Sequence, residues 1–181
     1  MERTGGRAAA LQRAVTGRRA VVLVLGGVVT LAASAGAGAG TATGTFTVQA
    51  AINAACNVSA TTLSFGTYNP ASATALTGNS TISVYCTSGS AYTASLNVGS
   101  GGGTFATRTL ASGGNTLNYN LFKDTGYSQI WGDGSASTYT VSGTGSGLLT
   151  ANTITVYGQI PISQDEPVGT YTSTITVTVS Y

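Results

Sequence analysis

The 181-residue chain contains no histidine and very little charge. Without histidine, a Ser-His-Asp triad has no general base and a zinc site has no imidazole ligand. Charged residues make up 7% of the sequence, against about 25% in an ordinary soluble domain. We therefore expect neither histidine-dependent catalysis nor an interaction surface built on charge.

The few basic residues gather at the N-terminus, so the net charge of +2 does not describe the rest of the chain. After residue 39 the chain has two basic residues, Arg108 and Lys123, and four acidic ones, which gives a net charge of −2. Those four acidic residues are scattered and form no carboxylate pair for glycoside hydrolysis. Binding to nucleic acid through its phosphates is not expected, and no small-molecule substrate is implied.

The basic N-terminal stretch leads into an apolar run at residues 20–33. Fourteen residues are too few to span a bilayer, which needs about 20, but they suit the apolar region of a secretory signal. Small residues in an A-x-A pattern follow. We predict a signal peptide over residues 1–39, cleaved between residues 35 and 39. Arg18-Arg19 leaves the twin-arginine route as an alternative to general secretion.

An exported chain meets an oxidising compartment, where Cys56 and Cys86 are expected to form a disulfide. Closing the loop of 29 residues between them would stabilise the fold by roughly 3 to 4 kcal/mol. The alternatives are two free thiols or half of a metal site. With no histidine in the chain, we expect no metal and no other cofactor.

Alternating apolar residues predict an all-β fold. Short segments place every second side chain on one face, as strands do, and glycine-rich turns separate them, as in a β-sandwich. The alternating sets are Val58, Leu63 and Phe65; Ile82, Val84 and Cys86; Tyr92, Ala94 and Leu96; Leu117, Tyr119 and Leu121; Ile154, Val156 and Ile160; and Tyr171, Ile175, Val177, Val179 and Tyr181.

One further alternating segment, at residues 44–56, precedes the first cysteine. It places Phe46, Val48, Ala50 and Ile52 on one face of an extended chain. The alternation alone allows two interpretations of this segment: the opening strand of the sandwich, or a strand that completes another sheet.

No residue cluster predicts chemistry. Asp133, between two glycines, is either a turn residue or a calcium ligand, and the turn is the more frequent use. Trp131 is either a core anchor or a sugar-stacking platform, and Ile130 beside it favours the core. We predict that the protein is not an enzyme.

The order of features resembles the spore coat protein U domain family. The similarity lies in TFTVQAAINAACNVSATTLSFGTYNP, ISVYCTSG, RTLASGGNTLNYNLFKD, IWGDG, TVYGQIP and the final YTSTITVTVSY, which together cover residues 45–181. Members of that family resemble subunits of archaic chaperone-usher pili. The resemblance implies an immunoglobulin-like β-sandwich that lacks its final strand and is completed by donor-strand complementation from a neighbouring subunit.

With that resemblance, residues 40–53 are predicted to be the donor extension and residues 54–181 the pilin-like domain. Phe46, Val48, Ala50 and Ile52 would enter a neighbour's groove. Ile175, Val177, Val179 and Tyr181 would line the groove of their own domain, after which a complete sandwich would need one more strand.

The implied function is that of a structural subunit of a secreted surface fibre, for adhesion or biofilm formation. Its partners would be neighbouring copies or related subunits, a periplasmic chaperone and an outer-membrane usher, and it would pass through the periplasm to the cell surface. The alternative is a monomeric spore or cell-envelope coat protein whose own extension fills its groove.

Overall fold

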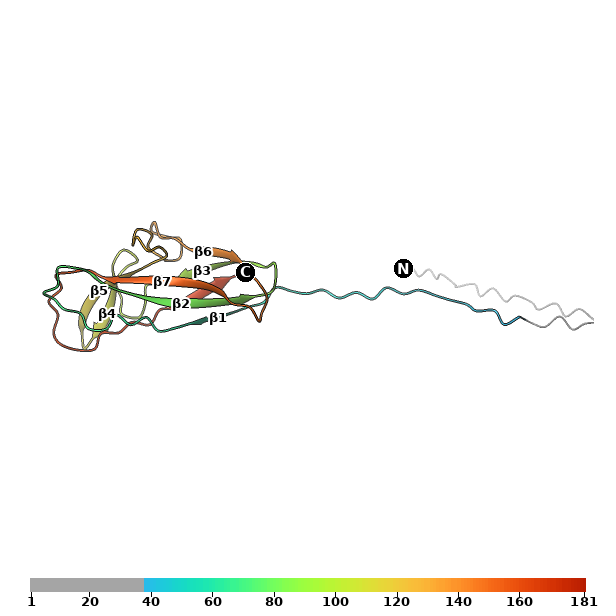
Figure 1. Ribbon diagram of the computed structural model, residues 1–181, viewed down its shortest axis with the longest axis horizontal. Coiled ribbons are helices and arrows are strands. Elements are labelled where there is room, and N and C mark those ends of the chain that lie inside the picture. The colour runs from blue at the N-terminus through green and yellow to red at the C-terminus, as the bar shows by residue number, and fades with distance from the viewer. Residues whose placement is uncertain (1–37) are drawn as a thin grey trace, which may run out of the picture. The chain divides into compact units, whose positions relative to one another are not determined.

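A computed structural model describes residues 38–181, and the predicted signal peptide lies almost wholly outside this range. The chain divides into two units, Met1–Val48 and Gln49–Tyr181. The second unit contains eight strands and no helix (Figure 1). No helix long and apolar enough to cross a membrane occurs among the described residues.

The strands form two antiparallel sheets. Five strands lie in the order β1-β2-β7-β5-β4 and three in the order β6-β3-β8. Their bounds are β1 Cys56–Ala60, β2 Leu76–Cys86, β3 Ala91–Leu96, β4 Arg108–Ser112, β5 Asn115–Phe122, β6 Val141–Thr144, β7 Asn152–Ile160 and β8 Val177–Ser180.

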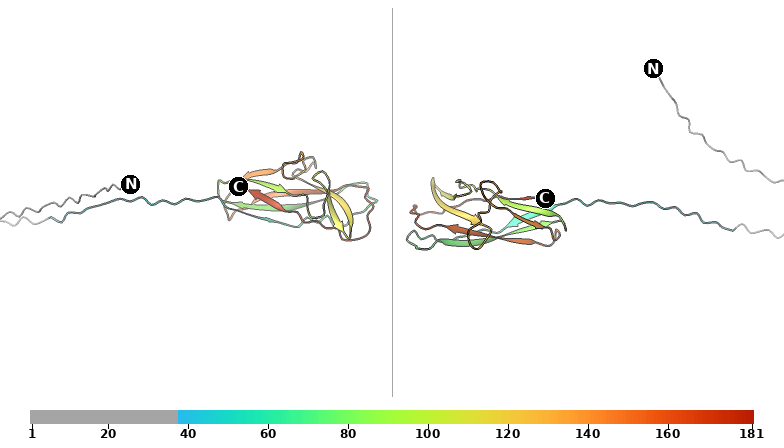
Figure 2. Two further views of the ribbon diagram at one scale, coloured as in Figure 1. Left: turned by 180° about the vertical axis from the view of Figure 1, so that it is seen from behind. Right: turned by 90° about the horizontal axis from the view of Figure 1, so that it is seen from above.

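The larger sheet curls because β5 changes partner along its length. Its first residues pair with β4, whereas only Asn120 to Phe122 pair with β7. In the views of Figures 1 and 2, β4 and β5 cross the end of the unit opposite the C-terminus. There Ala111 of β4 exchanges two backbone hydrogen bonds with Thr172, at 2.9 and 3.1 Å, which joins the two sheets on one side.

The core lies between the sheets and follows the predicted alternation. Buried side chains come from one face of each central strand: Ile82, Val84 and Cys86; Tyr92, Ala94 and Leu96; Leu117, Tyr119 and Leu121; and Val156 and Ile160. Trp131 is fully buried and donates its indole N–H to Ala94 O at 3.1 Å, which confirms it as a core anchor. The Cys56–Cys86 disulfide, also as predicted, joins facing positions of β1 and β2.

Residues 38–55 form no strand and are exposed. The side chains of Phe46 and Ile52 are each 88% exposed, and that of Val48 is 83% exposed. A single extended segment has no ladder partner of its own, so alternation alone does not make it a strand. The predicted donor segment is thus an exposed, unpaired row of apolar side chains.

Candidate functional site: an open groove between two unpaired edges

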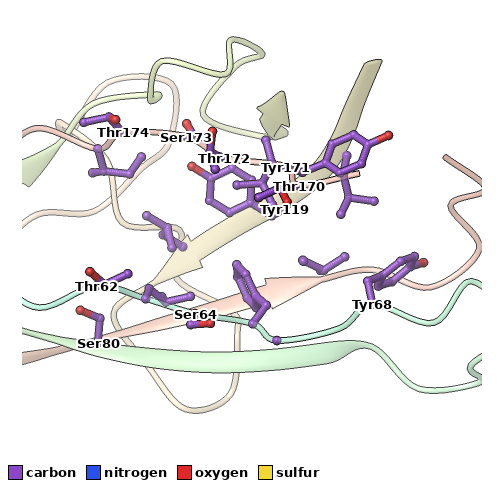
Figure 3. Close-up of a pocket in the computed structure, with 18 of the residues that line it drawn as sticks. Thr62, Ser64, Tyr68, Ser80, Tyr119, Thr170, Tyr171, Thr172, Ser173 and Thr174 are labelled. Carbon is purple, nitrogen blue, oxygen red and sulfur yellow. The ribbon is translucent and has the colours of Figure 1, made fainter. Parts of the chain in front are cut away.

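A groove of about 1030 Å³ opens between the two sheets, and Thr172 of the Ala111–Thr172 connection belongs to its lining. One wall is formed by residues 61–70, which follow β1, and the other by residues 166–177, which lead into β8. Figure 3 shows Thr62, Ser64 and Tyr68 along one side and Thr170 to Thr174 along the other. The floor is apolar and includes Ile82, Leu96, Leu117, Leu121, Val156 and Ile160.

The backbone groups of the second wall form hydrogen bonds on one side only. Thr172, Thr174 and Thr176 bond with Ala111, Ser100 and Asn97. In an extended chain, backbone groups of alternate residues point to opposite sides. The backbone N–H and C=O groups of Ser173 and Ile175 therefore point away from these partners, and no backbone hydrogen bond joins them to another described residue.

The first wall is also unpaired. Thr61 still bonds to Thr81 O at 3.0 Å, but residues 62–68 make no backbone–backbone hydrogen bond within the described chain. Buried or edge backbone groups left without partners are costly and tend to recruit them. The groove therefore lies between two rows of free donors and acceptors, which is the geometry that an added strand requires.

A pair of glycines shapes the first wall. Gly78 of β2 lies directly opposite Gly158 of β7, and the side chains of Leu63 and Phe65 cover this bare patch. A Cβ at position 158 would come within 2.7 Å of Phe65 Cζ and 2.9 Å of Leu63 Cδ1. Gly158 is therefore a point where another segment approaches the backbone of β7 closely. The missing side chains at positions 78 and 158 leave room for Leu63 and Phe65 to pack directly on the sheet at this wall.

Aromatic side chains line the outer half of the groove. Phe65 meets Tyr119 edge to face, with ring centroids 6.2 Å apart. Tyr68 donates its hydroxyl to Pro161 O at 3.0 Å and accepts the Gln164 N–H at 3.1 Å, which fixes the wall at the mouth. Tyr171 donates to Pro167 O at 2.8 Å on the opposite side. Loss of hydration raises the pKa of Tyr171, and the charge of Glu166 raises it further.

The Tyr119 hydroxyl is the one buried side-chain polar atom without a hydrogen-bond partner among residues 38–181. Burial raises its pKa, while the Ser173 hydroxyl and the Arg108 charge act in the opposite direction. The Ser173 Oγ accepts the Gly101 N–H at 3.0 Å. The groove floor thus combines a hydrophobic surface with one unused polar group.

The structure brings some of the predicted groove residues together. Ile175 and Val177 line the groove, and Val179 packs against the core further along β8. Tyr181 is 61% exposed and lies outside the groove lining. Their role toward a donor strand, like that of Phe46, Val48, Ala50 and Ile52, stays a prediction.

A buried arginine, Arg108, lies behind the second wall and was not predicted from the sequence. Arg108 is fully buried, although no carboxylate from residues 38–181 pairs with it. Its Nη1 donates to Asn120 Oδ1 at 2.7 Å, its Nη2 to Trp131 O at 2.7 Å and to Asn97 O at 3.0 Å, and its Nε to Asn97 O at 3.1 Å. Burial lowers the pKa of Arg108, partly opposed by Tyr119 and Asp133. The planar guanidinium joins three segments around neutral acceptors.

No group of three or more His, Cys, Asp or Glu side chains comes together over residues 38–181. Asp133 accepts hydrogen bonds from the backbone N–H and hydroxyl of Ser135, at 2.8 and 2.6 Å. These contacts lower the pKa of its carboxyl and identify it as a turn residue.

An all-β domain with an open, strand-sized groove is the class of protein that these features define. A family model, the Spore Coat Protein U domain, matches residues 42–178, and the chain therefore belongs to this family. No curated protein matches the sequence.

Among solved structures, the chain is similar to one in the CsuC-CsuE chaperone-tip adhesion subunit pre-assembly complex, from the archaic chaperone-usher Csu pili of Acinetobacter baumannii. The TM-score is 0.51 at 24% sequence identity. The match covers 72% of this chain and 40% of the other, so this chain spans well under half the length of its structural relative. The likeness supports the fold.

Proposed function

We propose that the protein is a structural subunit of an exported surface fibre, in which each copy donates a strand to the groove of the next. The observation that carries this proposal is the groove itself, with free backbone groups on both walls. Strand addition to such an edge supplies ladder hydrogen bonds along the backbone and pockets for alternate side chains.

The donor in this proposal is the exposed segment before β1. Phe46, Val48, Ala50 and Ile52 would face the groove floor, because alternate side chains of an extended segment share one face. Burying the three large ones would contribute roughly 5 to 9 kcal/mol before the costs of association. A contact made head to tail does not close on itself and generates a filament.

An open groove must be protected before assembly, since an uncovered apolar edge promotes aggregation. We therefore assign a periplasmic chaperone and an outer-membrane usher as partners, by likeness to the Csu complex whose subunit is held by a chaperone. The disulfide fits an exported protein that passes through the periplasm and ends at the cell surface. Adhesion or biofilm formation is the role proposed for the fibre.

The test compares the mature chain with a variant that lacks residues 44–52. The full chain should form a ladder that resists mild denaturant, whereas the truncated chain should fold and stay monomeric. Adding a peptide of residues 44–53 should raise the melting temperature of the truncated chain. A scrambled peptide of the same composition, which breaks the alternation, is the matched control and should have no effect.

Two results would count against the proposal. Filaments assembled from the truncated chain would show that residues 44–52 are not the donor. A full chain that stays a single small species, more stable than the truncated chain at every concentration, would instead indicate the self-complemented coat protein.

A further inference from the structure

Two loop tips of the Gln49–Tyr181 unit expose aliphatic side chains. In the turn between β6 and β7, Leu149 is fully exposed and Leu148 half exposed. In the segment after β7, Val168 is fully exposed and Ile162 is 44% exposed. Isolated apolar residues on a surface are common, so the exposure of these side chains matters only if assembly brings the two tips together.

These two tips lie at opposite ends of the unit. The Leu148–Leu149 turn is at the disulfide end, because Gly147 donates its N–H to Cys86 O at 3.0 Å. Ile162 and Val168 follow the other end of the β2–β7 pair, where Leu76 faces Ile160. The 11 residues of β2 separate the two ends by about 35 Å. The tips therefore cannot cover each other within one copy.

The groove is open at one end only. Its lining extends from Ala60 to Pro70 on the first wall and reaches Glu166, Pro167 and Val168 at the mouth. At the disulfide end, β1 and β8 come into contact, and the lining contains no residue of either strand beyond Ala60 and Val177. A donated segment that continues into a folded domain must therefore leave the groove at the mouth, beside Val168.

The connection between donor segment and domain is short. From Ile52 to Cys56, the first residue of β1, is four residue steps, which span at most about 14 Å. If Ile52 lies at the mouth of a neighbour's groove, the disulfide end of its own domain must lie close to that mouth. The Leu148–Leu149 turn belongs to that end, Val168 belongs to the mouth, and Ile162 follows the end of β7 at which Ile160 faces Leu76.

We infer that the Leu148–Leu149 turn of each copy packs against Ile162 and Val168 of the next copy, as a second contact beside the donated strand. This inference rests on the proposed function, because strand donation is what brings these ends together. The partner is a second copy of this chain. The contact restricts the angle between successive subunits, which the four-residue connection alone would leave free.

The test uses the full chain with Leu149→Cys and Val168→Cys together. Both positions are exposed, so the fold should tolerate the changes. After assembly, a short bismaleimide should link neighbouring copies into a covalent ladder that survives boiling in detergent. Each single-cysteine variant is a control, and Leu149→Cys with Thr125→Cys, an exposed position in a different loop, is the matched control pair. The controls should give at most isolated dimers.

The outcomes separate the contact from the proposed function. Fibres with the covalent ladder would support the contact. Fibres that form normally but link no better than the control pair would overturn the contact and leave strand donation standing. If the unsubstituted chain forms no fibres, both the contact and the proposed function are wrong.

Discussion

Replacing Arg108 by methionine tests whether the buried guanidinium supports the groove. The side chain makes four hydrogen bonds to three acceptors, Asn97 O, Trp131 O and Asn120 Oδ1. Methionine fills a similar volume but leaves Asn97 O and Trp131 O without a donor in the core, whereas Asn120 Oδ1 still accepts the Leu121 N–H at 2.9 Å. Each buried, unsatisfied group costs about 1 to 3 kcal/mol, and removing a buried charge returns part of that cost.

The expected loss of unfolding free energy is therefore about 2 to 4 kcal/mol. A domain of this size is usually stable by only about 5 to 15 kcal/mol, so the change should be obvious in urea titrations of the chain lacking residues 44–52. Lysine in place of Arg108 should destabilise to a similar extent, because one ammonium cannot reach three acceptors in a fork. Lys123→Met, which removes only the Nζ that lies 5.2 Å from the Tyr139 ring centre, should cost less than about 1 kcal/mol.

The same substitution should weaken binding of the donor peptide. Asn97 accepts from Arg108 through its carbonyl, and its side-chain Oδ1 accepts the Thr176 N–H at 2.9 Å. Loss of Arg108 therefore loosens the residue that holds the second wall. Buried ionic networks can sometimes be replaced by apolar side chains without loss of stability. A methionine variant that is as stable as the parent and binds the peptide with unchanged affinity would place Arg108 in that group and refute the predicted effect.

Two further predictions concern the first wall and the acid limit of stability. Gly158→Ala should lower the unfolding free energy by about 1 to 3 kcal/mol, because the new methyl group overpacks against Phe65 and Leu63, and it should also weaken peptide binding. Thr155→Ala, on the exposed face of β7, is the control and should change stability and binding by little. Equal effects of the two substitutions in thermal melts and peptide titrations would contradict the proposed packing. Hydrogen bonds from Gln129 and Ser128 lower the pKa of Asp124, so its contribution to stability is present above the ordinary carboxyl pKa of about 4 and is lost as pH falls through the lower folded value. Asp124→Asn should flatten the acid side of a plot of melting temperature against pH, and an unchanged slope would contradict this.

Local alternation was enough to predict the core. The faces carrying Ile82, Val84 and Cys86, or Tyr92, Ala94 and Leu96, are buried as expected, because a period of two fixes which side chains share a face whatever the strand pairs with. The disulfide followed from the number of cysteines and the predicted export.

The final segment shows what alternation cannot predict. The sequence indicated one continuous strand over residues 171–181, but only Val177–Ser180 belongs to a ladder with β3. Before it, Thr176, Thr174 and Thr172 bond in turn to Asn97, Ser100 and Ala111. The strand changes partners along its length, and partner choice depends on the curl of β4 and β5, which leaves no local pattern.

Arg108 and the facing glycines were missed for the same reason. Burial of a cation depends on acceptors supplied by Asn97, Asn120 and Trp131, none of which is adjacent to it in sequence. Gly158 could be recognised as permissive, but its partner Gly78 follows from the register of β2 and β7. The burial of Arg108 and the facing positions of Gly78 and Gly158 are both set by contacts between segments that are distant in sequence.

The low charge of the sequence is consistent with the proposal that the groove walls accept a strand. Natural edge strands are usually protected from pairing by lysine, by inward-pointing charge or by proline. Within the two walls, proline and charge occur at the mouth, as Pro70, Glu166 and Pro167, and residues 61–69 and 168–177 contain neither. A wall with no charge along its length exposes its backbone to any extended segment, which is a liability for a monomer that folds alone. It is an advantage for a subunit whose edges are to be covered by another chain.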